Sequence, residues 1–229
     1  MLYLLKDSRP ELANPIKELT RMMSEPTMKH TEEMYRIIKW VIENPDVGLK
    51  MKPEVELDER GKIIWRMRGI CDSTWGSCKE DGKSVTGYVL YFMGVPVAFK
   101  SKQQPLVTLS SAEAEYVGIS ELAKEVLFAK QLVEDFGITL ELPVRIFVDN
   151  MGAIQMVRNN RGGSETRHVN VRFHFVREMH GKLLELVYVR SEDNKADMMC
   201  KNPTEEVFKR HTPKMVGKVP SELTDRIKN

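Results

Sequence analysis

The spacing of apolar residues changes along the chain, and this change limits the fold more than any other feature. From Lys62 onward, strand-like runs come first, and helical and strand-like segments then alternate. Strands followed by alternating helices and strands are typical of a mixed sheet with helices packed on it. We therefore predict an α/β domain over residues 62–203.

The predicted domain begins with three strands, and a long helix follows that Ser110 or Ser111 caps and Gly137 ends. One segment stays open, because Val169 and Val171 alternate as in a strand, whereas Val169, Phe173 and Val176 also suit a helix. The predicted elements are strands at Ile63–Asp72, Gly87–Met93 and Val97–Lys100, a helix at Ser111–Phe136, a strand at Val144–Val148, a helix at Asn150–Val157, a strand at Leu184–Val189 and a helix at Asn194–Cys200.

Residues 1–61 have a different pattern. Apolar residues recur at helical spacing after Asn14-Pro15 and again over Thr31–Ile42, which predicts two helices in a small N-terminal appendage. The acidic stretch Pro53–Gly61 lacks such a period, so we place the domain boundary there. Residues 204–229 form a charged C-terminal tail in this division.

Composition narrows the class of protein. No apolar run reaches the roughly 18–20 residues of a membrane span, and the start, MLYLLKDSRPEL, is too short and too quickly charged for a secretory signal. Three cysteines without a paired spacing indicate free thiols in a reducing compartment. We expect an intracellular protein of the cytoplasm or nucleus that is not secreted and does not bind a membrane.

The net charge of +2 says little about partners, but basic residues gather in one region. A surplus of this kind suits a phosphate backbone, although scattered solvated charges would give the same pattern. The basic residues are Arg158, Arg161, Arg167, Arg172, Arg177 and Lys182, opposed only by Glu165 and Glu178.

Glu115 is the most unusual acid in the predicted long helix. At about 3.6 residues per turn, it falls in the middle of the apolar stripe that includes Ile119 and Leu122, whereas Glu113 falls on the opposite side. A carboxylate that faces a core is costly unless it is paired, hydrogen-bonded, protonated or bound to a metal. The alternative is that Glu115 gains from the helix dipole and edge exposure of the first turn.

Three further acids lie where the same site could form. Asp149 directly follows the predicted strand Val144–Val148, Asp72 ends the first strand, and Asp197 lies in the first turns of the last helix. Ligands of open α/β sheets collect at strand ends, although aspartate is also common there as a turn former. Four converging carboxylates would suit Mg²⁺ or Mn²⁺.

Several stretches resemble one known family. The stretches TGYVLYFMGVPVAFKSKQQPLVTLSSAEAEYVGIS, FVDNMGAI, TRHVNVRFHFVRE and YVRSEDNKADMM resemble the ribonuclease H domain at the C-terminal end of copia-type retrotransposon polyproteins. The preceding stretch, SRPELANPIKELTRMMSEPTMKHTEEMYRIIKWV, is similar to the connection segment that follows the reverse transcriptase in these polyproteins. The resemblance implies a ribonuclease H-like fold and a helical segment from His168.

The resemblance also implies a catalytic site. The family's acidic tetrad falls on Asp72, Glu115, Asp149 and Asp197, which would bind two Mg²⁺ ions about 3.5–4 Å apart, with Mn²⁺ as an alternative. The implied substrate is the RNA strand of an RNA–DNA hybrid. We predict nucleic-acid contacts at Trp75, Asn150, Arg167, His168 and Arg172. For Trp75, packing in the core is the alternative to stacking on a sugar or base.

Some residues depart from the family pattern. Thr74 stands where the family usually has a second aspartate, and the loop Arg190–Lys195 lacks the histidine of cellular ribonucleases H. The chain also has no YxDD-like polymerase motif, and the resemblance suggests a reverse transcriptase polymerase domain on another chain as a partner. Two hypotheses follow: a metal-dependent endonuclease of retrotransposon replication, or a non-catalytic remnant that binds at most nucleic acid or protein.

Overall fold

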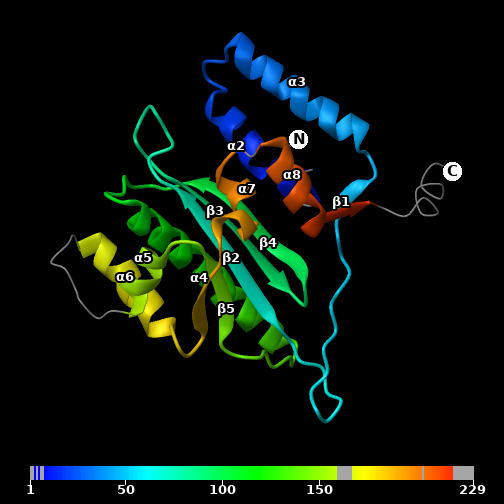
Figure 1. Cartoon of the computed structure of the whole chain (residues 1–229), viewed down its shortest axis with the longest axis vertical. Helices are drawn as coiled ribbons and strands as arrows, with labels where there is room; N and C mark the ends of the chain where they lie inside the picture. The colour runs from blue at the N-terminus through cyan, green and yellow to red at the C-terminus, as the bar shows by residue number, and fades with distance from the viewer. Residues whose placement is uncertain (1–2, 4, 6–7, 159–166, 203, 219–229) are drawn as a thin grey trace. The chain divides into compact units, whose positions relative to one another are not determined.

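The computed structural model describes the chain except residues 1–2, 4, 6–7, 159–166, 203 and 219–229 (Figure 1). The contacts between residues divide the chain into two compact units. We call Lys52–Cys200 the sheet unit, and Met1–Met51 together with Lys201–Asn229 the helical unit. The division into 1–61, 62–203 and 204–229 stays a prediction about which parts fold independently.

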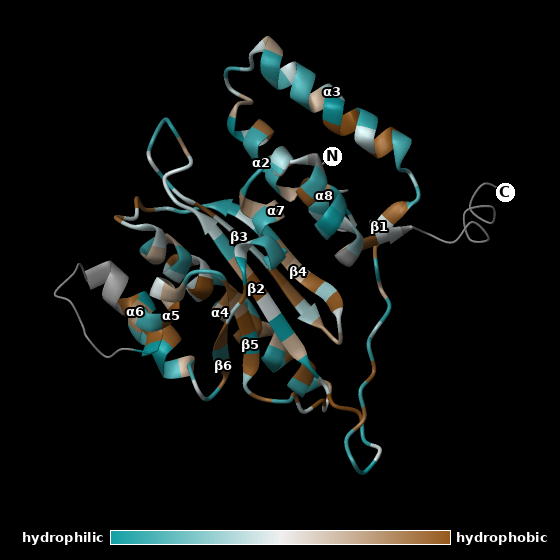
Figure 2. Cartoon of the chain, viewed as in Figure 1, coloured by the Kyte–Doolittle hydropathy of each residue, from teal (hydrophilic) through white to brown (hydrophobic). Residues whose placement is uncertain are grey.

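The sheet unit is built on a five-stranded mixed sheet with the order β4-β3-β2-β5-β6. β2, β3 and β4 are antiparallel neighbours, and β5 and β6 run parallel to β2. The predicted mixed α/β sheet is therefore confirmed. The strands are β2 Met67–Thr74, β3 Val85–Phe92, β4 Val95–Gln103, β5 Val144–Val148 and β6 Leu184–Tyr188. Hydrophobic residues colour β5 and β6 brown in Figure 2.

The first predicted strand begins later than its apolar pattern indicates. Ile63 and Trp65 form only isolated bridges, to Leu57 and Leu140, and the regular ladder with β3 starts at Met67. The pattern before Met67 reflects these separate pairings, together with the stacking of Trp65 on Phe92 at 5.9 Å between ring centroids.

Helices cover the sheet, and the long helix α4 supplies much of the core. Its residues Leu122 and Val126 are fully buried in one cluster with Ile146 of β5 and Leu186 of β6. Burial of this apolar surface is the main force that fixes α4 on the sheet. The helices of the sheet unit are α4 Ser111–Asp135, α5 Met151–Arg158, α6 Arg167–Met179 and α7 Asp197–Cys200, with a 3-10 turn, η2, at Ser191–Asp193.

The segment that the sequence left open, which includes Val169, Val171 and Phe173, lies in the helix α6, as the family resemblance implies. The Tyr116 hydroxyl of α4 donates to the Phe173 carbonyl oxygen at 2.9 Å, and the two rings lie 4.0 Å apart. Val176, three residues on, is fully buried, whereas Val171 is 68% exposed. The helical spacing therefore matches the burial, and the strand-like alternation does not.

The helical unit combines segments from both ends of the chain. β1 pairs with β7 antiparallel, with Gly48 opposite Gly217. The rings of Trp40 and Phe208 meet edge to face at 5.1 Å. The segment predicted to be a charged tail thus contains a helix and a strand. The elements are η1 Pro10–Leu12, α2 Ala13–Arg21, α3 Met28–Glu43, β1 Val47–Leu49, α8 Glu205–His211, η3 Thr212–Lys214 and β7 Val216–Lys218.

Among the described residues, every helix is too short or too polar to span a bilayer. The three cysteines, Cys71, Cys78 and Cys200, are free thiols and buried, as expected from their spacing.

Candidate metal centre

Two of the four predicted acids stand at the carboxyl ends of neighbouring parallel strands. Ile70 of β2 pairs with Phe147 of β5, and Asp72 and Asp149 each follow two residues later. Equal offsets along parallel strands bring the two side chains to the same edge of the sheet. Asp72 is only 2% exposed, and Asp149 is half-buried.

Helix α4 carries the third acid. The Ser110 hydroxyl caps the helix by accepting from the Glu113 backbone N–H at 3.2 Å. Glu115 lies two residues further along α4 and is 3% exposed. Its Oε1 accepts from the backbone N–H of Ser73 at 2.8 Å. Glu113 instead accepts from the Leu109 N–H at 2.6 Å. Glu115 therefore faces the sheet, and edge exposure does not explain its position.

Gly118 allows α4 to lie this close to β2. An added Cβ at this residue would lie 2.6 Å from Ser73 Oγ and 2.8 Å from Cys71 Sγ, distances that real Cβ atoms do not show. Gly118 is three residues after Glu115, so both lie on the helix face that meets the sheet. The close approach is what lets the Glu115 carboxylate reach the backbone of β2.

The fourth acid, Asp197, is the first residue of α7. Gly87 of β3 lies opposite Asp72, and an added Cβ there would lie 2.5 Å from the Cβ of Met199. Successive residues of a strand point to opposite faces. Gly118 of α4 packs against Cys71 and Ser73, whereas α7 packs against Gly87, the neighbour of Asp72 on β3. The two helices therefore approach the sheet from opposite faces, as Figure 1 shows.

Asn194 fixes the loop before α7, a role that the sequence analysis missed. Its side chain is fully buried, donates from Nδ2 to the Cys71 carbonyl oxygen at 3.0 Å, and accepts at Oδ1 from the Ala196 N–H at 3.1 Å. Thr74, which replaces a family aspartate, donates from its hydroxyl to the Cys200 carbonyl oxygen at 3.3 Å. Both ends of α7 are thus tied to β2.

The four acids converge in two overlapping groups. Asp72, Glu115 and Asp149 each offer a ligand atom, and these atoms lie within 4.8 Å of one another. A second group within the same limit consists of Asp72, Asp197 and Cys200. Asp72 is shared by both. Cys200 was not predicted as a ligand, although its position three residues after Asp197 on a helix was a usable signal.

The electrostatics of Glu115 favour a bound cation. Burial raises the pKa of its carboxyl group far above the ordinary value, and the negative charges of Asp72 and Asp149 raise it further. Its Oε2 has no hydrogen-bond partner among the described residues. Oxygen-rich acidic donors are the ligands that Mg²⁺ and Mn²⁺ prefer. The residues present therefore fit a divalent cation, which would remove the unfavourable proximity of the acids.

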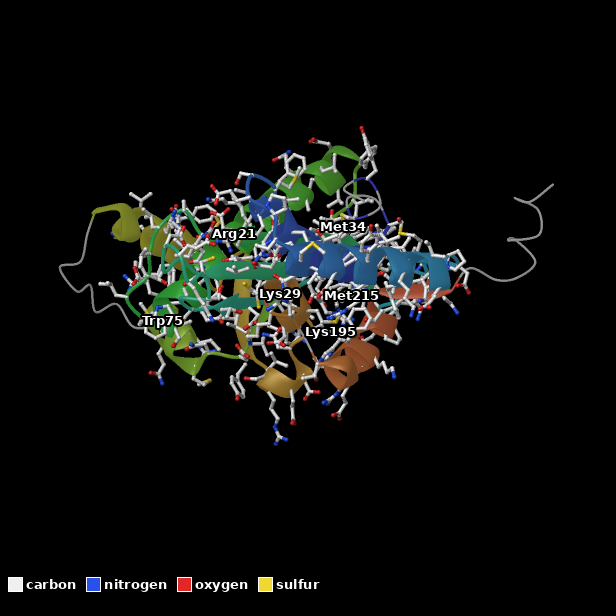
Figure 3. All side chains as sticks on the ribbon, turned by 90° about the horizontal axis from the view of Figure 1, so that it is seen from above. Arg21, Lys29, Met34, Trp75, Lys195 and Met215 are labelled. Atoms are coloured by element: carbon white, nitrogen blue, oxygen red, sulfur yellow. The ribbon has the colours of Figure 1, made fainter. Side chains whose placement is uncertain are left out.

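The predicted nucleic-acid contacts are placed as follows. Trp75 is 53% exposed and therefore does not pack in the core; its indole N–H donates to the Thr108 carbonyl oxygen at 2.9 Å, and Figure 3 shows it at the periphery. Asn150 caps α5 by accepting from the Ala153 N–H at 3.0 Å. Arg172 lines a cavity of about 260 Å³. The side chains of Arg167 and His168 lie outside the described residues.

Several curated proteins with similar sequences are Pol polyproteins from transposons. The chain is 28% identical over 221 residues to the retrovirus-related Pol polyprotein from transposon RE1 of Arabidopsis thaliana, and 29% identical over 221 residues to that from transposon RE2 of the same plant. Each match covers 96% of this chain but only 14% and 15% of those proteins, so the chain spans about one seventh of their length. The expected resemblance to retrotransposon polyproteins is confirmed. No protein-family model matches the chain.

Ribonucleases H are among the solved structures that match part of this chain. LC11-RNase H1, isolated from compost, covers 63% of this chain and 96% of its own, with 16% identity and a TM-score of 0.45. RNase H1 from the archaeon Halobacterium salinarum covers 59% of this chain and 94% of its own, with 16% identity and a TM-score of 0.42.

Proposed function

We propose that this chain is a metal-dependent endonuclease that cleaves the RNA strand of RNA–DNA hybrids, as part of a retrotransposon replication protein. The observation that carries the proposal is the convergence of Asp72, Glu115 and Asp149 from a strand end, a helix and a neighbouring strand end. The sequence similarity to transposon Pol polyproteins over 96% of the chain supports it independently.

The proposed cofactor is a pair of Mg²⁺ ions, with Mn²⁺ as the alternative. The residues that would hold them are Asp72, Glu115, Asp149 and Asp197. The chemistry that paired divalent ions supply to phosphodiester hydrolysis is activation of the attacking water and stabilisation of the leaving oxygen.

The protein's own groups hold the ligands in place. The Ser73 N–H fixes Oε1 of Glu115, and the Glu115 carboxylate has a ligand atom within 4.8 Å of those of Asp72 and Asp149. Asn194 and Thr74 bind the backbone at both ends of α7, which sets the position of Asp197. These contacts use backbone groups of rigid elements, and rigid positioning is what a metal-assisted reaction requires of the protein.

Five residues outside the acidic tetrad are proposed to contact the substrate. Trp75 directly follows β2, three residues after Asp72, and offers an exposed ring for stacking on a sugar or base. Arg172, and with it Arg167 and His168 of the same helix, would bind phosphates, and Asn150 follows Asp149 directly. A polymerase domain on another chain is the proposed protein partner, and the cytoplasm or nucleus is the proposed location.

A labelled RNA–DNA hybrid incubated with Mg²⁺ tests the proposal. The parent should cleave the RNA strand, Asp149→Asn should reduce cleavage by far more than the 10- to 100-fold typical of residues behind the ligands, and Glu113→Gln should cleave like the parent. Glu113 is the matched control because it lies on the same helix and its carboxylate accepts from the Leu109 backbone N–H.

Two other results would contradict the proposal. Equal cleavage by the parent and Asp149→Asn would assign the activity to a contaminant. No cleavage by a folded parent at any Mg²⁺ or Mn²⁺ concentration would favour the alternative of a non-catalytic remnant.

A further inference from the structure

We propose that Cys200 gives this centre a position for thiophilic divalent ions such as Zn²⁺ and Cd²⁺, held by Asp72, Asp197 and the Cys200 sulfur. The inference rests on the proposed function in using two of the same acids, and it goes beyond it in assigning a sulfur ligand and a different class of metal.

The three donors already lie together. Ligand atoms of Asp72, Asp197 and Cys200 are within 4.8 Å of one another, and the Cys200 thiol donates to Asp72 Oδ2. Asp197 and Cys200 are the first and last residues of α7 and share one face of the helix. Zinc binds sulfur at about 2.3 Å and carboxylate oxygen at about 2.0–2.2 Å. At a tetrahedral angle, the sulfur and oxygen donors of one ion therefore lie about 3.6 Å apart, so side-chain movements of roughly an ångström suffice.

The thiol is also held in place by packing. Cys200 is 4% exposed and packs with Cys78 and Val85. Its carbonyl oxygen accepts from the Thr74 hydroxyl, and Gly87 lets the adjacent Met199 lie directly on β3. A ligand on a fixed helix loses little freedom when it binds, which favours affinity.

A second observation points to a cation here. Glu115 is 3% exposed, its Oε2 lacks a hydrogen-bond partner among the described residues, and its carboxylate belongs to the group that shares Asp72. A buried acceptor without a partner is costly. A cation bound at Asp72, the residue that both groups share, would offset that cost.

The sulfur decides which ions this position selects. Thiolates bind Zn²⁺ and Cd²⁺ well, whereas Mg²⁺ prefers oxygen. As the metal–sulfur bond forms, the thiol proton leaves to solvent, so the step is balanced without an oxidant or reductant. Because Asp72 and Asp197 would be occupied, a thiophilic ion would compete with the Mg²⁺ of the proposed nuclease.

Titration of the metal-free protein with Cd²⁺ tests the assignment, because a cadmium–thiolate bond has a charge-transfer band in the ultraviolet. The parent should show the band with a stoichiometric endpoint, and Cys200→Ser should lose it. Cys78→Ser is the matched control, since it makes the same change in the neighbouring buried thiol, and it should keep the band. Asp149→Asn should keep it too, because Asp149 lies only in the other group.

A band of equal size in Cys200→Ser, or its loss in Cys78→Ser, would overturn the assignment. If Cys200→Ser does not fold, as judged by far-ultraviolet circular dichroism, Asp197→Asn decides with the thiol intact. It should weaken Cd²⁺ binding at least about tenfold, by the loss of one ligand, and unchanged affinity would overturn the assignment.

The two proposals fail separately. A Cd²⁺ band without any Mg²⁺-dependent cleavage would leave the thiophilic position standing and remove the nuclease. Cleavage by a parent that shows no band would do the reverse. Where both hold, Zn²⁺ should inhibit Mg²⁺-dependent cleavage at lower concentration in the parent than in Cys200→Ser.

Discussion

Asp72 is the residue on which the centre depends most, because both groups of candidate ligands contain it. It lies on β2 between Cys71 and Ser73, whose side chains meet α4, and opposite Gly87, which meets α7. A single aspartate can therefore face acids brought by two helices on different sides of the sheet. No other acid of the tetrad stands between two helices in this way among the described contacts.

Glu115 gives a prediction for pH dependence. Without metal, its folded-state pKa is raised above the ordinary value of 4.5, so the folded state holds a proton that the unfolded chain releases. The free energy of unfolding should then fall as pH rises above that value, by at most about 1.4 kcal/mol per pH unit. Glu115→Gln should remove this dependence and stabilise the metal-free protein at neutral pH.

Urea unfolding in a chelator, at about pH 6 and about pH 8, measures the effect. The parent should be less stable at the higher pH, Glu113→Gln should behave like the parent, and saturating Mg²⁺ should reduce the difference. The same pH dependence in Glu115→Gln as in the parent would show that another group is responsible.

At this scale, the sequence predicts some residues and misses others for physical reasons. Glu115 could be distinguished from Glu113 because helical spacing fixes which side chain faces the core. The spacing of Cys200 after Asp197 was a usable signal, but the sequence does not pair Asn194 or Cys200 with the residues that they contact on β2. Their partners, Cys71 and Asp72, are more than one hundred residues away in the chain, and only the packed fold brings them together.

At the scale of elements, two glycines set the distance between helices and sheet. Gly118 lets α4 approach β2, and Gly87 lets α7 approach β3. The strand and helix patterns predicted these elements well, since each buries one face. The short α7 was predicted as part of a longer helix from Asn194; it begins at Asp197 instead, and the Asn194 side chain holds the preceding loop by its bonds to Cys71 and Ala196.

Gly87→Ala should displace α7. The new methyl group would lie 2.5 Å from Met199 Cβ and 2.9 Å from the Ala196 carbonyl oxygen, neither of which is the end of a flexible side chain. We expect a loss of about 1–3 kcal/mol in the free energy of unfolding, as for other overpacked positions, and weaker metal binding because Asp197 moves.

Chemical denaturation and calorimetric titration with Mn²⁺ measure the two effects. Gly48→Ala is the control, since a Cβ added there would meet nothing within 4 Å. Unchanged stability and unchanged metal affinity in Gly87→Ala would mean that α7 does not depend on this close approach.

At the scale of the whole molecule, the chain forms two compact units whose boundaries the sequence pattern did not show. Residues 201–218 belong with the N-terminal helices, through the pairing of β1 with β7 and the contact of Trp40 with Phe208. Short strands of three residues and a charged seven-residue helix carry too little periodicity to be recognised. Their structure depends on partners at the other end of the chain.

Deletion of residues 201–229 should disrupt the helical unit and leave the sheet unit folded. The variant should lose the order of residues 1–51, because β1 and Trp40 lose their partners, whereas the core of residues 52–200 should remain folded. Limited proteolysis followed by mass spectrometry should show rapid cleavage within residues 1–51 and a protected fragment that includes α4. Protection of the N-terminal residues equal to that in the parent would contradict the division.

The antiparallel pair of β1 and β7 also sets an order of events during translation. β1 leaves the ribosome early, but its partner at Val216–Lys218 emerges only after the whole five-stranded sheet has been synthesised. Nascent chains usually complete their N-terminal part first. Here the sheet unit can reach its native state before β1 and β7 have paired and completed the helical unit.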